Sequence, residues 1–430
     1  MLWTHQTDVS IQRRGGIRRR DFLRGVSAAA FAAGMLGWQD MMALRADDLK
    51  RRGKACILLW MEGGPSQFET FSPKPRHENG GETQAIATNV SGIQIADNLP
   101  KLAQHMHELA IIRSVTSKEG NHPRAQQLLH TGYLPNPTVK YPTFGALATQ
   151  ALAAKDTALP AFCRIGGRFR TAGGGGILGV EYDPFEITNP EKAPAYTKPS
   201  HGAVRFGKRL ELMKRMEADY RAADGAQVVA DHQQLYDKTA RMILSPEMKT
   251  FDVEQEKPSV IDAYGRTKFG ASCLLARRLI EAGVTFVEVG LNGWDTHQNN
   301  FAECRRQCGT IDQPVAQLLT ELRERGLLES TLVIWMGEFG RTPRINPRAG
   351  RDHFPRAFNV AVAGAGIRGG QVIGATDAAG EQVTDRPVTV PDLFRTYCQA
   401  LGIDPNTENT TPLGRPIKAV GGGKTIAELF

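Results

Sequence analysis

Acidic and histidine side chains that follow short apolar runs are the residues of this sequence best suited to chemistry. Asp295 and His297 come shortly after the apolar run 284–289 and are two residues apart. In an extended or turning loop, that spacing brings a carboxylate and an imidazole within reach of one metal ion. The alternative is that Asp295 caps a helix that begins nearby and that His297 is only a surface residue. We predict that both side chains are metal ligands.

A second group of candidates follows the apolar run 331–335. Three further predicted ligands lie there: Glu338, Asp352 and His353. Two arginines, Arg341 and Arg351, occur among these residues. Because a guanidinium group is planar and presents several N–H donors, it suits an oxyanion. We therefore assign both arginines to the stabilisation of negative charge that develops on a substrate.

The first apolar run, 55–61, leads into Glu62, two glycines and then Ser66. Two glycines allow a tight turn, which would present the Glu62 carboxylate at the end of a strand as a further metal ligand. Ser66 is a candidate nucleophile if the fold brings its hydroxyl to the metal. The alternative is a structural turn with a solvated Glu62.

A polar loop at 117–121 leads into a helix that we predict to start at Pro123. The free N–H groups and the dipole at a helix N-terminus favour anions, and His122 would lie near that end. We assign His122 as an acid, a base or a nucleophile. The alternative is an ordinary capped helix with a surface histidine.

These candidates need a framework that brings the ends of several strands together. Five β-branched or apolar runs are predicted to be buried strands: 55–61, 110–115, 284–289, 331–335 and 359–363. Amphipathic stretches at 267–282 and 301–326 are predicted to be helices. The alternation predicts an α/β fold, a doubly wound and mostly parallel sheet flanked by helices, with ligands bound beyond the carboxyl ends of the strands. The charged stretch at about 204–256 is predicted to be a helical insertion or cap.

The first 46 residues have the layout of an export signal. The run 18–24, with the pair Arg19-Arg20 before Asp-Phe-Leu, precedes a short stretch rich in alanine and glycine. This pattern is typical of a twin-arginine signal, with cleavage expected after Ala46. The alternative is an amphipathic basic helix at the surface. We expect a periplasmic or otherwise exported protein whose residues 47–430 form a single domain.

Composition excludes several classes of protein. The 430 residues carry a net charge of +8, but residues 1–46 hold seven arginines and three aspartates, which is +4 of that total. The rest of the chain is only mildly basic and has no basic patch interleaved with aromatic residues, so we expect no nucleic-acid partner. No run of 18 apolar residues occurs, so we expect no membrane span. The sequence does not predict the oligomeric state.

Six cysteines are too few to organise a chain of this length through disulfides. Cys304 and Cys308 lie four residues apart in a predicted helix, where an intrahelical disulfide is geometrically awkward. Half of a metal site is one possibility for this pair. Packing as free thiols is the interpretation that we prefer.

The sequence also carries a set of blocks that occur together in one known family. The blocks are GGPSQFETF, NHPRAQQLLHTG, GWDTHQNN, GEFGRTP, GRDHF and GGQVIGATDAAG. They resemble the exported bacterial proteins called the domain of unknown function 1501 family, from about residue 50 to 405. That family is similar to a sulfatase-like branch of the alkaline phosphatase superfamily. The resemblance implies a doubly wound α/β sandwich that hydrolyses phosphate or sulfate esters at a metal site.

The resemblance also implies roles for particular positions. Glu62 corresponds to the first-strand acid that binds metal in these enzymes, and His353 to the final histidine ligand. Asp295 and His297 correspond to the loop that supplies an aspartate and a histidine. Glu338 begins the block that supplies two later ligands.

Two positions depart from the superfamily pattern. Phe339 stands where a second ligand is normally histidine or asparagine, and phenylalanine cannot bind metal. Asn121 or His122 stands where the nucleophile is normally cysteine, serine or threonine. Histidine can act as a nucleophile, and a metal-activated water could attack without a covalent step.

The sequence therefore predicts an exported metal-dependent hydrolase of sulfate or phosphate esters, acting on a small-molecule or glycan ester. The predicted cofactor is a divalent metal, with zinc, manganese or calcium compatible with the mixed ligands, and magnesium after them. The alternative is a catalytically inactive sulfatase-like protein that binds a metal or an anionic glycan at the cell surface. A third interpretation, a partner subunit for another exported protein, would require a sizeable exposed apolar patch.

Overall fold

The structure is a computed structural model that describes residues 53–430, apart from 155–156, 168–170, 195–201 and 223–225. The predicted export signal and its cleavage point after Ala46 lie outside the described residues. Within the described part of the chain, no helix combines the length and the apolar character that crossing a bilayer requires.

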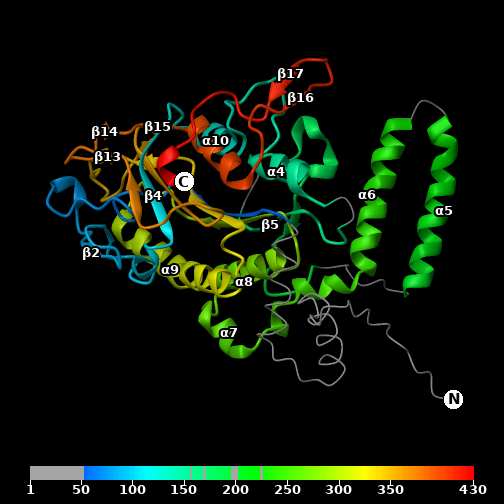
Figure 1. Cartoon of the computed structure of the whole chain (residues 1–430), viewed down its shortest axis with the longest axis horizontal. Coiled ribbons are helices and arrows are strands. Elements are labelled where there is room, and N and C mark those ends of the chain that lie inside the picture. The colour runs from blue at the N-terminus through cyan, green and yellow to red at the C-terminus, as the bar shows by residue number, and fades with distance from the viewer. Residues whose placement is uncertain (1–52, 155–156, 168–170, 195–201, 223–225) are drawn as a thin grey trace, which may run out of the picture. The chain divides into compact units, whose positions relative to one another are not determined.

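A nine-stranded sheet forms the centre of the described chain (Figure 1). In sheet order, its strands are β12 (Gln371–Ile373), β4 (Leu109–Thr116), β11 (Phe358–Ala363), β8 (Thr331–Met336), β1 (Ala55–Glu62), β7 (Phe286–Asn292), β5 (Phe162–Gly166) and β6 (Phe185–Ile187), with β15 (Val388–Thr389) also paired to β4. Only β11 runs antiparallel to its neighbours among these strands. The predicted mostly parallel α/β sheet is confirmed.

The five predicted strands are the five adjacent strands β4, β11, β8, β1 and β7. Every residue of β8 and of β11 is buried, and so are the six central residues of β1. A strand covered on both faces reads as a continuous apolar run, which explains why these strands could be predicted.

Helices cover both faces of the sheet. The main ones are α3 (His122–Thr131), α4 (Phe144–Leu152), α8 (Lys268–Glu281), α9 (Asn300–Glu324) and α10 (Val390–Leu401). In Figure 1, α8 and α9 lie below the sheet, and α4 and α10 lie above it. Contacts agree with this arrangement, because α8 touches β1, β5 and β7, while α4 touches β5 and β7, and α10 touches β8. The sheet is therefore doubly wound, as predicted.

Several short strands and helices surround the central sheet and its main helices. Four two-stranded sheets consist of β2 (Ala85–Ala87) with β3 (Gln94–Ala96), β9 (Gly340–Arg341) with β10 (His353–Phe354), β13 (Ala375–Thr376) with β14 (Val383–Asp385), and β16 (Glu408–Thr410) with β17 (Pro416–Lys418). The short helices are α7 (Pro258–Ala263) and the 3₁₀ turns η1 (Glu78–Gly80), η2 (Leu102–His105), η3 (Gly176–Leu178), η4 (Val180–Tyr182), η5 (Pro246–Phe251), η6 (Val253–Gln255) and η7 (Ala427–Leu429).

The charged stretch expected to be a helical insertion is helical. It contains α5 (Ala203–Ala222) and α6 (Ala226–Leu244), followed by η5 and η6. The two long helices pack against each other, and α6 also contacts η4 and η5 (Figure 1).

All six cysteines are buried and free. The Cys304 thiol faces the Asn300 side chain, and the Cys308 thiol faces the Glu69 carbonyl. Burial raises the pKa of both thiols, which disfavours the thiolate that a metal would need. The structure thus agrees with packing rather than with half of a metal site.

A buried group of charged residues ties β5 to β7 and α3. Glu288 accepts a hydrogen bond from Arg164 Nε at 2.7 Å, and its second oxygen lies 2.7 Å from His130 Nε2. All three side chains are at most 2 % exposed, so each charge depends on the others for compensation. Burial would raise the pKa of Glu288, but Arg164 and His130 outweigh it and lower that pKa to about 2.

This depressed pKa predicts sensitivity to acid. Because the folded-state pKa lies below the ordinary value of 4.5, the Glu288 carboxylate contributes stability above pH 4.5, and that contribution is lost as the pH falls towards 2. We expect the free energy of unfolding, measured by urea titration, to fall more steeply between pH 5 and about pH 3 in the wild type than in Glu288→Gln. Equal pH dependence in the two proteins would contradict this.

Candidate metal centre

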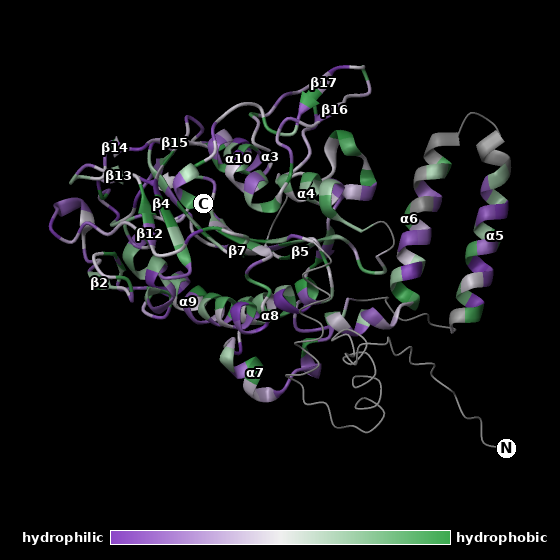
Figure 2. Ribbon diagram, in the orientation of Figure 1, coloured by the Kyte–Doolittle hydropathy of each residue, from purple (hydrophilic) through white to green (hydrophobic). Residues whose placement is uncertain are grey.

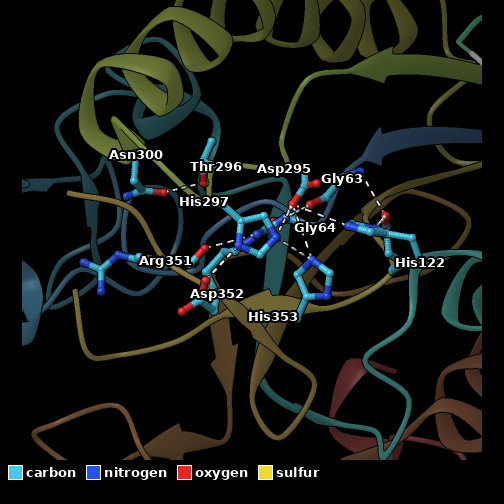
Figure 3. Close-up of polar contacts among 12 residues, drawn as sticks. Gly63, Gly64, His122, Asp295, Thr296, His297, Asn300, Arg351, Asp352 and His353 are labelled. Carbon is cyan, nitrogen blue, oxygen red and sulfur yellow. Dashed lines mark hydrogen bonds and ion pairs between the residues drawn. The ribbon is translucent and has the colours of Figure 1, made fainter. Parts of the chain in front are cut away.

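The candidate site lies where β1, β7 and β8 end side by side. The loop after β7 carries Asp295 and His297, and the residues after β8 carry Glu338 and Arg341. His353 arrives on β10, which pairs with β9 so that His353 faces Arg341 across the two strands. His122 is the first residue of α3. Four segments far apart in the sequence thus supply one group of side chains (Figure 3).

Each of three histidines is held by a hydrogen bond at its Nδ1 atom. His122 Nδ1 lies 2.6 Å from Glu338 Oε1, and His297 Nδ1 lies 2.8 Å from Asp352 Oδ1. His353 Nδ1 lies 2.8 Å from the Gly120 carbonyl oxygen. All three partners are acceptors, so each Nδ1 carries the proton and donates. In a neutral ring, the Nε2 atom is then unprotonated and carries a lone pair.

These three Nε2 atoms converge on one carboxylate oxygen. Asp295 Oδ1 lies 3.4 Å from Nε2 of His122, 3.1 Å from Nε2 of His297 and 3.4 Å from Nε2 of His353. The Nε2 atoms of His297 and His353 are 3.0 Å apart. Figure 3 shows the three rings gathered around Asp295.

This arrangement fits a metal ion. Lone pairs that face one another repel unless a cation or a proton lies between them, and the polar neighbour of the buried His122 Nε2 atom is Asp295 Oδ1, 3.4 Å away. Ligands about 2.0–2.1 Å from zinc in a tetrahedron lie about 3.3 Å from one another, close to the separations of 3.0 to 3.4 Å between Asp295 Oδ1 and the three nitrogens and between His297 and His353. Outer hydrogen bonds from Nδ1 to a carboxylate or carbonyl are typical of histidines that bind metal.

Arg341 orients Asp295 and does not face a substrate. The arginine is fully buried, and its Nη2 atom donates to Asp295 Oδ1 at 2.6 Å. Its other donors reach the carbonyls of Gly64 and Arg351. Burial opposes ionisation of Asp295, but hydrogen bonds with His122, His353 and Arg341 hold the pKa of that carboxyl well below its usual range. Asp295 is therefore ionised and ready to bind a cation.

Gly63 and Gly64 make the close approach possible. A Cβ atom on Gly63, where φ is +117°, would lie 2.5 Å from the Asp295 nitrogen. A Cβ atom on Gly64, where φ is +76°, would enter the ring of Phe339. The Gly63 N–H donates to Glu338 Oε1 at 3.0 Å, so the turn after β1 also holds the carboxylate that holds His122.

Phe339 forms the floor of the site. It is 1 % exposed, and its ring centroid lies 4.8 Å from that of His122 and 4.5 Å from that of His353. The residue that departs from the ligand pattern thus packs against two imidazoles and restricts where they can turn. Its position explains why an apolar side chain follows Glu338.

Electrostatics at His122 follow from the same contacts. Burial alone would lower its pKa, but hydrogen bonds with Asp295 and Glu338 outweigh burial and raise that pKa to about 9. In the metal-free protein, a proton therefore occupies His122 at neutral pH, where it compensates two carboxylates. A metal ion would have to replace that proton, since a ligating imidazole must be neutral.

The structure brings most of the predicted residues together, but some of them contact different partners from those that the sequence predicted. Glu338 and Asp352 hold the Nδ1 atoms of His122 and His297, so they contact candidate ligands rather than Asp295 Oδ1, on which the Nε2 atoms converge. Glu62 ends β1 at the same edge of the sheet, where its carbonyl accepts from the Trp294 N–H. Among the described residues, the group whose ligand atoms lie within 4.8 Å of one another consists of His122, Asp295 and His353, and it includes neither Glu62 nor His297.

Arg351 and Ser66 are not at the site. The Arg351 guanidinium is fully buried and donates to Glu69 at 2.9 Å, and it lies over the rings of Phe68 and Phe301. Figure 3 shows it pointing away from the histidines, so the assignment to an oxyanion is corrected to an internal ion pair. Ser66 is also fully buried, which closes its hydroxyl to a substrate and removes it as a nucleophile.

Two features of the site had no signal in the sequence. The Gly120 carbonyl that holds His353 is 233 residues away along the chain and has no side chain to mark it. The role of His122 as a candidate ligand depends on Glu338, 216 residues away, which fixes its ring. The sequence predicts a functional glutamate at the strand end and a functional histidine before the helix, but it does not predict their contact.

Removing the outer carboxylates is expected to weaken metal binding to different extents. Loss of an outer partner usually costs 10- to 100-fold in metal affinity. We expect Glu338→Ala to fall in that range, because the Glu338 side chain is 1 % exposed and water cannot replace it well. Asp352→Ala should cost less, since the Asp352 side chain is 55 % exposed. Competition with a chromogenic chelator for zinc would measure both, and a larger loss in Asp352→Ala would contradict this.

Together, the doubly wound sheet and the convergent side chains define an α/β protein with a candidate histidine–aspartate metal centre. The chain belongs to the family described as Protein of unknown function (DUF1501), which it matches over residues 53–430. This confirms the family inferred from the sequence blocks. None of the curated proteins matches the sequence.

Several solved structures resemble the chain at a distance. The PsFucS1 sulfatase from Pseudoalteromonas sp. is 14% identical, with 85% of this chain and 72% of that chain covered and a TM-score of 0.41. A protein in the alkaline phosphatase superfamily from Vibrio parahaemolyticus is 12% identical, with 82% and 67% covered and a TM-score of 0.38. The C-terminal periplasmic domain of EcEptC from Escherichia coli is 10% identical, with 85% and 90% covered and a TM-score of 0.37. Likeness at this level transfers no activity to the chain.

Proposed function

We propose that this protein binds one divalent metal ion through His122, Asp295, His297 and His353, and that it hydrolyses sulfate or phosphate esters. The observation that carries the proposal is the convergence of three Nε2 atoms on Asp295 Oδ1, with each Nδ1 atom engaged on the outer side. Three nitrogens and one oxygen suit zinc or manganese better than calcium, which prefers oxygen ligands.

The chain's own residues would prepare the site for this chemistry. A divalent ion held there would polarise an ester oxygen and lower the pKa of a water molecule. Glu338 and Asp352 would fix the proton on Nδ1 of His122 and His297 and leave Nε2 free as a ligand. Arg341 would keep Asp295 ionised and correctly turned. Phe339 would exclude water from one side of the imidazoles.

The choice of ester follows from the family blocks rather than from the site geometry. Sulfate and phosphate esters are the substrates that the resemblance implies, carried by a small molecule or a glycan. The twin-arginine pattern at 1–46 supports export to the periplasm, where such a substrate would be met.

A non-enzymatic function is the second candidate, because the positions that the family pattern assigns to the nucleophile are Asn121 and His122 in this chain. The Asn121 side chain caps α3 by accepting from the Arg124 N–H, and Ser66 is buried. A protein that binds the metal, or an anionic glycan through it, would need neither group. Direct attack by a water would also need neither, so turnover decides between the two.

Ester turnover by metal-loaded protein tests the proposal. We would compare zinc- and manganese-loaded samples with chelated samples on aryl sulfates, aryl phosphates and sulfated or phosphorylated sugars. Turnover that is lost on chelation and in Asp295→Ala supports the hydrolase. Metal binding without turnover of any of these esters supports the binding protein instead.

A further inference from the structure

We propose that the outer face of α5 binds the surface of an anionic phospholipid bilayer. This inference is independent of the metal centre and of the proposed hydrolysis. It starts from three large apolar side chains on α5 that are exposed: Val204 at 77 %, Leu212 at 58 % and Met216 at 72 %. They follow a spacing of eight and four residues, which places them on one side of a helix.

Cations share that side of the helix. Arg205 and Arg209 are four residues apart, Lys208 lies between Val204 and Leu212 at the same spacing, and Arg215 lies next to Met216. All four are exposed, and none has an ion-pair partner within the described residues. The fifth exposed cation of α5, Lys214, is different, because it pairs with Asp237 of α6 at 2.7 Å.

The opposite charge is nearly absent from the exposed part of α5. Between 204 and 218, where exposure is described, Glu211 is the one exposed acid against five exposed cations. An excess of cations interleaved with large apolar side chains is complementary to lipid head groups, which are anionic, and to the acyl region beneath them.

The packing of the helix pair leaves this face free. The opposite side of α5 packs on α6, and α6 contacts η4 and η5 (Figure 1). Leu212 and Met216 lie at the edge of this face, where they also line an open groove of about 600 Å³ together with Met213 of α5 and Val229 of α6. Figure 2 shows hydrophilic segments of α5 in purple, interrupted by more hydrophobic segments in green.

Vesicle co-sedimentation of the full chain tests this proposal. We expect binding to phosphatidylglycerol vesicles, weak or no binding to phosphatidylcholine vesicles, and release by salt. The paired change Lys208→Glu with Arg215→Glu should weaken binding at least about tenfold. The matched control is Arg305→Glu with Arg415→Glu, two exposed cations outside α5 that give the same change in net charge. Because all variants keep the N-terminal 52 residues, differences among them report on α5.

Three results would overturn the proposal. One is the absence of binding to phosphatidylglycerol vesicles, and another is an equal loss in the control pair, which would mean that only net charge matters. The third is a stable dimer by light scattering that Leu212→Ser with Met216→Ser dissociates, without vesicle binding, which would assign the face to a second copy of the chain. Metal content should be unchanged in every variant, so failure here leaves the proposed function untouched.

Discussion

His353→Ala is expected to lower zinc affinity by on the order of 100-fold or more. Binding at a four-ligand zinc site is worth about 10–16 kcal/mol, so each ligand accounts for several kcal/mol. His353 has a double role, because its Nε2 atom lies 3.4 Å from Asp295 Oδ1 and 3.0 Å from His297 Nε2. Without the His353 ring, the His297 Nε2 atom would lose the neighbouring nitrogen that it faces. Phe339 would also lose one of the rings that it packs against.

Isothermal titration with zinc, or competition with a chelator, measures this affinity. The matched control is His107→Ala, which removes an exposed histidine that lies just before β4. The loop that leads to His122 leaves the other end of that strand. Affinity in the control should equal that of the wild type. Wild-type affinity in His353→Ala would show that the convergent rings do not bind the ion together.

Arg351→Ala is expected to destabilise the fold by about 3–5 kcal/mol, the usual cost of leaving one charge of a buried pair without its partner. The Arg351 and Glu69 side chains are both fully buried and share a hydrogen bond of 2.9 Å. Arg351 also donates to the carbonyls of Asn79 and Thr342. One guanidinium thus anchors the residues beside Asp352 and His353 to the segment after β1.

Chemical unfolding of Arg351→Ala, Glu69→Gln and the double variant Arg351→Ala with Glu69→Gln tests this account. The double variant should lose less than the sum of the two single variants, because it leaves no unpaired charge behind. Strict additivity would contradict the ion pair. A loss of about 1 kcal/mol or less in Arg351→Ala would contradict the buried ion pair and would favour the role at the substrate that the sequence predicted for this arginine.

The fold could be predicted where burial on both faces makes the sequence of a strand apolar. β1 and β8 are covered on both faces, and their buried runs 56–61 and 332–336 are apolar without interruption. β5 escaped prediction because Arg164 stands in its centre, and that arginine is buried only because Glu288 and Gly173 accept its hydrogen bonds. Because Glu288 is 124 residues from Arg164 along the chain, the sequence around Arg164 does not reveal this ion pair.

The sequence predicts which residues gather at the candidate site better than it predicts the contacts among them. Strand ends and loop residues pointed to Asp295, His297, Glu338 and His353, because parallel strands bring such positions to one edge. No local feature of the sequence distinguishes a candidate ligand from the residue that holds it, which is why the sequence predicts Glu338 and Asp352 as ligands and His122 as a reacting group. Both arginines look alike in sequence, yet Arg341 reaches Asp295 and Arg351 turns to Glu69.

The amount of metal bound per chain tests the central claim most directly. We would measure zinc and manganese by plasma mass spectrometry in wild-type protein folded in metal-replete cells, beside His297→Ala, Asp295→Ala and the control His107→Ala. The account predicts about one ion per chain in the wild type and in the control, and little in the other two variants. Folded wild-type protein that holds no metal, even after incubation with zinc and manganese, would contradict it.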